Sequence, residues 1–160
     1  KIVPSAMVTT YEQIQDLNKF DAFLCGPGMG NSHDDILKTV LDGASYVVLD
    51  ADGIRALARN NFKAPETCKL IMTPHLGEYS ALVESFAQDS DQTTPQNWLD
   101  TLAKVKEKTN AYAIAVKANT VWLAINDNLL VVDGQNPSLG VAGSGDVLSG
   151  LVTALVAGGF

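Results

Sequence analysis

The chain has 160 residues, 46% of them hydrophobic and 18% charged, a balance typical of a globular domain with a substantial core. Its formal net charge of −7 argues against a broad nucleic-acid surface or an anionic membrane surface, although a local phosphate site remains compatible. No apolar run reaches the roughly 18 residues of a membrane span. The two cysteines have no metal-type spacing, and no apolar segment of a signal peptide follows residue 5. We therefore expect a cytoplasmic protein with reduced thiols.

The first half of the chain alternates short apolar runs with loops rich in glycine or polar residues. An apolar run that a glycine loop stops is typical of a buried strand, and apolar residues at three- and four-residue spacing predict a helix. The pattern predicts a helix over 9–19 and strands over 22–25, 46–49 and 70–72. A loop follows each strand, over 26–30, 50–53 and 73–78. A helix follows each loop: the first is capped by Asn31 or Ser32, the second spans 54–59 and the third spans 79–86.

The second half continues this alternation after a polar loop. The spacing of Trp98, Leu102 and Val105 predicts an amphipathic helix. Two apolar runs that flank Asn126-Asp127-Asn128 indicate a hairpin. The pattern thus predicts a loop over 87–95, a helix over 98–108, strands over 112–117, 121–125 and 129–132, a loop over 136–146, and a final helix that begins at Val147.

These elements predict an α/β fold in which a mostly parallel central sheet is flanked by helices, with an antiparallel hairpin at one edge. We expect one domain over residues 1–160. In open α/β sheets, ligands bind at the carboxyl ends of the strands. The polar and glycine-rich loops therefore lie where a site belongs.

The last of these loops, Ala142-Gly143-Ser144-Gly145-Asp146, leads directly into the final helix. Glycines allow close approach of the backbone to a ligand, and the free amides of a helix start favour an anion. The carboxylate of Asp146 beside such a site suggests proton removal from a hydroxyl that attacks a phosphoryl group. The alternative is that Asp146 only caps the helix and the glycines make a tight turn.

Five motifs together resemble one family. The chain is similar to the ADP/ATP-dependent NAD(P)H-hydrate dehydratases, which have the ribokinase-like fold. The Thr-Pro-His element is the most specific, because related vitamin kinases usually have Asn where His75 stands. The motifs occur in the order Gly26-Pro27-Gly28-Met29-Gly30, Asp50-Ala51-Asp52-Gly53, Thr73-Pro74-His75-Leu76-Gly77-Glu78, Lys117-Ala118-Asn119-Thr120-Val121 and Ala142-Gly143-Ser144-Gly145-Asp146.

The resemblance implies an enzyme that phosphorylates the hydroxyl of hydrated NADH or NADPH with ADP or ATP and Mg²⁺, and then eliminates phosphate. It implies that Asp146 is the catalytic base and also contacts the hydrate, together with Gly30 and His75. Glu78 and Asn136 are weaker candidates for holding phosphates or the metal. The implied anion hole comprises Ala142, Gly143, Ser144 and Gly145, and the implied nucleotide site comprises Lys117, Ala118, Asn119, Thr120, Val121 and Gly145.

Several alternatives stay open. His75 suits a helix cap as well as a ligand contact, Lys117 suits an ordinary strand end, and Asp50 or Asp52 suits orientation of the site or a cap. Family members usually have Gly where Ala118 stands, and they have further elements at both ends, so we expect an incomplete domain. A vitamin-precursor kinase and a non-catalytic nucleotide-binding fragment are therefore the rival functions. An exposed sheet edge would favour a homo-oligomer.

Overall fold

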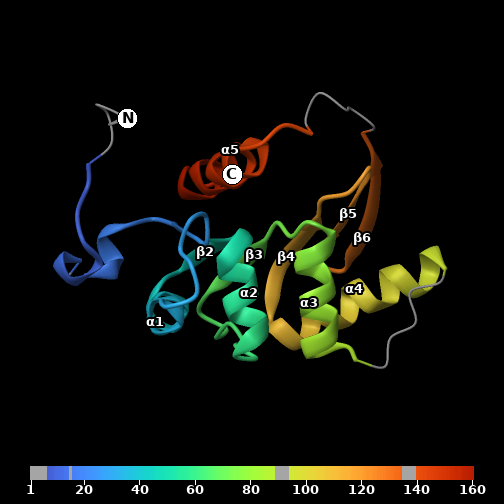
Figure 1. The fold of residues 1–160 in the computed structure, drawn as a ribbon, viewed down its shortest axis with the longest axis horizontal. Helices are drawn as coiled ribbons and strands as arrows, with labels where there is room; N and C mark the ends of the chain where they lie inside the picture. Colours follow the sequence, from blue (N-terminus) through green and yellow to red (C-terminus); the bar gives the residue numbers. More distant parts are fainter. Residues whose placement is uncertain (1–6, 15, 89–93, 135–139) are drawn as a thin grey trace.

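A computed structural model of the chain describes residues 7–14, 16–88, 94–134 and 140–160 (Figure 1). The strands are β1 (Phe23–Cys25), β2 (Tyr46–Leu49), β3 (Lys69–Met72), β4 (Ala111–Val116), β5 (Thr120–Ile125) and β6 (Asn128–Asp133). The helices are α1 (Asp34–Gly43), α2 (Ala51–Arg59), α3 (Leu76–Phe86), α4 (Pro95–Thr109) and α5 (Ser144–Ala157), and two 3₁₀ turns, η1 (Tyr11–Gln13) and η2 (Leu17–Lys19), precede them.

The strands form one six-stranded sheet in the order β1-β2-β3-β4-β5-β6. The pairs from β1 to β4 are parallel, and the β4–β5 and β5–β6 pairs are antiparallel. Asn126, which begins the two-residue turn of the hairpin, adopts a left-handed φ of 50°, a conformation that asparagine tolerates. The predicted parallel sheet with an antiparallel hairpin at one edge is confirmed.

Helices cover the two faces of the sheet unequally. Because parallel neighbours in sequential order are joined by right-handed crossovers, the helices between β1 and β4 share one face. Their core contains Val47 and Leu49 of β2, whereas Val48 points to the opposite face and is also completely buried. Helix α5 contacts β1 and β2 and lies apart from the other helices (Figure 1). It therefore covers Val48, and only part of the second face.

Four helices, α2, α3, α4 and α5, each begin three residues earlier than predicted, and one predicted helix is wrong. Helix α2 begins at Ala51 because Asp50 accepts the Ala51 N–H at 3.0 Å and caps it, so residues 51–53 are not a loop. Helix α3 begins at Leu76 rather than Tyr79. The predicted helix over 9–19 is two separate 3₁₀ turns with no buried residue, because the backbone at Ile14 and Asp16, between the two turns, is extended. Helix α1 begins after His33 rather than after Asn31 or Ser32.

Two glycines let the ends of β1 and β2 approach one another closely. A Cβ on Gly26, whose φ is 130°, would lie 1.7 Å from the Asp50 carbonyl oxygen. A Cβ on Gly53 would lie 2.5 Å from the Cys25 carbonyl oxygen. The turn after β1 is thus packed directly against the first turn of α2.

This packing predicts that Gly53→Ala lowers the free energy of unfolding by about 1–3 kcal/mol, the usual cost of overpacking. Gly150→Ala is the matched control, because both glycines are helical and Gly150 has open space around its Cβ position. It should stabilise the protein by about 0.5–1 kcal/mol. Urea unfolding of both variants measures the difference, and equal values would show that the β1–α2 contact is not tight.

Apolar side chains remain exposed on the outer parts of the fold. On α5, Val147 is 72% exposed and Leu151 56%. On the edge strand β6, Val131 and Val132 are 50% and 51% exposed. Among the described residues, no helix combines the length and the apolar character that crossing a bilayer requires.

Candidate active site

Lys117 lies where three segments of the chain meet. Its Nζ is 2.7 Å from Oδ1 of Asp50, which follows β2. Its backbone N–H donates to the Pro74 carbonyl oxygen at 2.7 Å, and Lys117 pairs with His75 in a parallel bridge. A Cβ built on Gly145 would lie 3.4 Å from the same Nζ. The structure therefore brings the ends of β2, β3 and β4 together with the first turn of α5.

The first turn of α5 presents open hydrogen-bond donors. Gly143 precedes the helix with a left-handed φ of 87°. The N–H of Ser144 donates to the Val141 carbonyl oxygen at 3.2 Å, whereas the amides of Gly145 and Asp146 have no acceptor among the described residues. Of the predicted anion hole over 142–145, Gly145 thus offers a free amide beside Lys117, and Asp146 adds a second.

The side chain of Asp146 is exposed and accepts no hydrogen bond from any described residue. It is the third residue of α5, and Gly143, not Asp146, occupies the N-cap position. The capping role considered from the sequence is therefore absent in this structure. An unpaired carboxylate next to open amides is available to accept a proton.

His75 caps α3. Its ring Nδ1 accepts hydrogen bonds from the backbone N–H groups of Gly77 at 2.9 Å and Glu78 at 3.4 Å. In return, the backbone N–H of His75 donates to Oε2 of Glu78 at 2.9 Å. Because Nδ1 is an acceptor, the neutral ring carries its proton on Nε2, which lies 2.9 Å from Oε1 of the buried Glu78. Both ring nitrogens are engaged, but half of the side chain is exposed.

The remaining predicted residues lie, like Lys117, at the end of the sheet formed by the carboxyl ends of the parallel strands. Asp52 accepts the N–H of Gly30 at 2.8 Å and so fixes the turn after β1. Ala118 and Asn119 form the bend between β4 and β5, and Thr120 and Val121 begin β5. Asn136 lies outside the described residues.

No activated thiol lies at this edge. Burial, with a smaller contribution from Cys68, raises the pKa of Cys25 at the end of β1 to about 11. The thiol is therefore protonated at neutral pH, and Cys25 is unsuited to nucleophilic attack. The predicted reduced state agrees with the free thiols of both cysteines.

The described residues do not form a metal site by themselves. No group of three or more His, Cys, Asp or Glu side chains among them is placed to hold an ion. Asp50 is paired with Lys117, and Glu78 is engaged by His75. A Mg²⁺ ion that arrives with a nucleotide would take most of its ligands from phosphates and water.

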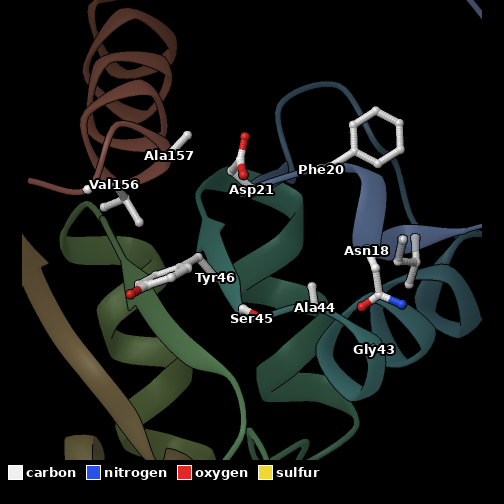
Figure 2. A pocket seen from close by; sticks show the side chains of 11 residues that line it. Asn18, Phe20, Asp21, Gly43, Ala44, Ser45, Tyr46, Val156 and Ala157 are labelled. Carbon is white, nitrogen blue, oxygen red and sulfur yellow. The ribbon is translucent and has the colours of Figure 1, made fainter.

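A pocket of about 310 Å³ lies at the other end of the sheet, where the parallel strands begin (Figure 2). It is lined by residues 43–46, which lead into β2, and by Val156 and Ala157 at the end of α5. Phe20 and Asp21 complete its rim (Figure 2). Because Tyr46 begins β2, this pocket lies at the amino end of the strand, away from Lys117 and Asp146.

The pairing of Asp50 with Lys117 is the feature that sequence reasoning missed. The two residues are 67 positions apart, and no local pattern links them. The available signal was that each polar residue directly follows a buried parallel strand, which places both at one edge of the sheet.

Comparison with known proteins finds one family model and several relatives that are similar to this chain. The family model described as NAD(P)H-hydrate dehydratase matches residues 1–159. A bifunctional NAD(P)H-hydrate repair enzyme of Gloeobacter violaceus is 33% identical over 89% of this chain, and one of Thermosynechococcus vestitus is 30% identical over 96%. The chain spans only 27% and 29% of the lengths of these two relatives.

Solved structures agree on the fold. A ribokinase-like superfamily protein from Enterococcus faecalis superposes with a TM-score of 0.67 at 26% identity, over 86% of this chain and 47% of that one. A hypothetical protein from Streptococcus mutans superposes with a TM-score of 0.66 at 20% identity, over 88% of this chain and 50% of that one. The fold is therefore ribokinase-like.

Proposed function

The chain belongs to the NAD(P)H-hydrate dehydratase family, and on this premise we propose that it is a nucleotide-dependent dehydratase that restores NADH or NADPH from their hydrates. The observation that carries the proposal is the position of the Lys117 ammonium beside Gly145 in the first turn of α5, the turn that also carries the exposed carboxylate of Asp146. A cation, two open amides and a free carboxylate suit phosphoryl transfer to a hydroxyl.

In the proposed reaction, Asp146 accepts the proton of the hydrate hydroxyl, and the oxygen attacks the terminal phosphorus of ADP or ATP. The bond between that phosphorus and the leaving nucleotide breaks. Lys117 and the amides of Gly145 and Asp146 stabilise the charge on the transferred group. The carbon–oxygen bond of the ester then breaks, phosphate leaves with the bonding electrons, and the adjacent ring carbon loses a proton, which restores the double bond.

Nucleotide contact is assigned to the segment Lys117, Ala118, Asn119, Thr120 and Val121 and to Gly145. Support comes from Lys117, the first residue of this segment, whose Nζ would lie 3.4 Å from a Cβ on Gly145. Mg²⁺ would neutralise the phosphates and would be held mainly by them and by water, because the described side chains do not form a metal site. The proposal predicts that NADPH hydrate becomes NADPH only when ADP or ATP is present, without a stable phosphorylated product.

Hydrate contact is assigned to Gly30, His75 and Asp146. Since both nitrogens of His75 are engaged, the contact would be made by the exposed part of its side chain. His75→Asn keeps a good N-cap residue but removes the ring, and with it the partner of Oε1 of the buried Glu78, so the free energy of unfolding should fall by about 1–3 kcal/mol. The KM for the hydrate should rise about two- to tenfold, as expected for loss of one aromatic contact.

His75→Ala is the control for this prediction, because it removes cap and ring together. It should lower the free energy of unfolding by about 1 kcal/mol more than His75→Asn does, the usual value for a lost N-cap. Thermal unfolding and steady-state kinetics of both variants separate the two roles. An unchanged KM in His75→Asn would leave His75 with the capping role alone.

We also propose that the chain forms a homo-oligomer. The exposed residues of β6, Leu129 to Val132, form an apolar edge that pairs only with β5 among the described residues, and such edges are normally covered in native proteins. A second copy of the chain would cover this edge by continuing the sheet. Sedimentation at micromolar concentration should give the mass of a dimer or larger species, and Val131→Lys should shift it to the monomer. A wild-type monomer would contradict the proposal.

A further inference from the structure

Asp50 is a buried carboxylate at the candidate site that the proposed reaction does not use. Its side chain is 4% exposed. Its Oδ1 accepts hydrogen bonds from the Ala51 N–H at 3.0 Å and from Lys117 Nζ at 2.7 Å. Because a buried charge is costly unless it is paired, the ammonium of Lys117 is the group that makes this burial possible. The pair needs an explanation beyond capping α2.

The backbone around Asp50 is fixed on every side. Its N–H donates to the Cys25 carbonyl oxygen at 3.2 Å, and its own carbonyl accepts the Gly53 N–H at 3.0 Å. Ala51 adopts a left-handed φ of 46°, a conformation that L-residues keep only where the surroundings impose it. The carboxylate therefore occupies one rigid position at the end of β2.

Lys117 is held at both ends of its side chain. Its backbone is anchored to Pro74, and its Nζ is anchored to Asp50. A lysine side chain is otherwise flexible and strongly hydrated, and it would extend into solvent. Three quarters of this side chain is buried instead. The geometry therefore selects a single direction for the ammonium group.

That direction leads to the first turn of α5. A Cβ on Gly145 would lie 3.4 Å from Lys117 Nζ and 3.6 Å from Asp50 Oδ2. The absence of a side chain at Gly145 lets the ion pair approach the helix, next to the open amides of Gly145 and Asp146. The ammonium and the two amides then converge on one region, which suits a phosphate group.

We propose that Asp50 is a positioning residue, which holds the Lys117 ammonium at the start of α5 so that it meets the phosphates of the nucleotide. This inference rests on the proposed nucleotide site at Lys117. It makes a prediction opposite to that of simple electrostatics. A carboxylate near a phosphate repels it, so charge alone predicts tighter binding when Asp50 is neutralised. Positioning predicts weaker binding.

The test is calorimetric titration of ADP and adenosine into wild type, Asp50→Asn, Lys117→Met and the double variant. In Asp50→Asn we expect the Kd for ADP to rise about tenfold, a coupling of ordinary size for contacting residues. The Kd for adenosine should change by less than about twofold, because adenosine has no phosphate. In the Lys117→Met background, Asp50→Asn should have little further effect on ADP.

Asp42→Asn is the charge-matched control, since Asp42 pairs with Lys38 on the exposed surface of α1. It should leave both affinities unchanged. Asp50→Glu keeps the charge and should restore part of the affinity that Asp50→Asn loses. It also serves as the informative variant if Asp50→Asn does not fold by circular dichroism, with an expected affinity below that of wild type.

Tighter or unchanged ADP binding in Asp50→Asn, an equal loss for adenosine, or fully additive losses in the double variant would overturn the positioning role while leaving the proposed function intact. Unchanged ADP affinity in Asp50→Glu would do the same if Asp50→Asn is unfolded. Absence of ADP binding by the wild type would overturn the proposed function, and the positioning role with it.

Discussion

Asp146→Asn should lower kcat for hydrate dehydration about 10²- to 10⁴-fold, the range that general base catalysis supplies. The amide has nearly the shape of the carboxylate but cannot accept the proton of the hydroxyl. Because Asp146 is exposed and accepts no hydrogen bond from any described residue, its replacement removes no internal contact. Stability should therefore stay within about 0.5 kcal/mol of wild type.

Nucleotide binding should survive this change. The open amides of Gly145 and Asp146 belong to the backbone and remain in place, and loss of a nearby negative charge slightly favours a phosphate. Asp127→Asn, in the exposed turn of the hairpin, makes the same change of charge away from the site and is the control. Turnover near the wild-type rate in Asp146→Asn would exclude this residue as the base.

Lys117→Ala should affect binding and stability together. Removing the ammonium leaves the carboxylate of Asp50 buried without its ion-pair partner. Loss of one member of a fully buried pair costs about 3–5 kcal/mol. Because a quarter of the Lys117 side chain is exposed, solvent screens part of this cost, and we expect a loss of about 2–3 kcal/mol in the free energy of unfolding.

The same variant should weaken ADP or ATP binding at least tenfold, about 1.4 kcal/mol, because it removes a cation from the phosphate site. Hydrate binding should change less. Titration with each ligand, together with urea unfolding, measures both effects, and Lys38→Ala on the surface of α1 is the control. An equal loss of affinity for nucleotide and hydrate would show that Lys117 has only a structural role.

Much of the sheet follows from the sequence because its strands are short apolar runs that end at glycine or polar residues. The run before Gly26 and the run before Asp50 each form a parallel strand, and the asparagine turn at Asn126 forms the hairpin. These are local features, and local patterns are sufficient to identify them.

The start of α2 was misjudged for a physical reason. Gly53 is a poor helix former, so the stretch from Asp50 to Gly53 resembles a loop. The structure shows that a glycine is needed there within the helix, because the Cys25 carbonyl oxygen occupies the space of a Cβ. A tertiary contact overrides helix propensity at this position.

The candidate site was predicted in outline but not in its contacts. The carboxyl ends of the strands bring Lys117 and Gly145 together, as the α/β pattern implies. The partner of Lys117 was not identified, because Asp50 lies 67 residues away and no sequence period relates the two. His75 was considered as a cap of α3, but the role of Nδ1 as the acceptor and the contact of Nε2 with Glu78 depend on ring orientation, which a sequence does not specify.

The most direct measurement is recovery of reduced-nicotinamide absorbance from NADPH hydrate by the 160-residue protein, with ADP, ATP or no nucleotide in the presence of Mg²⁺. We predict recovery that requires a nucleotide and is lost in Asp146→Asn. Nucleotide binding without any recovery would identify a non-catalytic binder, and a stable phosphorylated product would identify a kinase. Either result would contradict the proposed dehydratase.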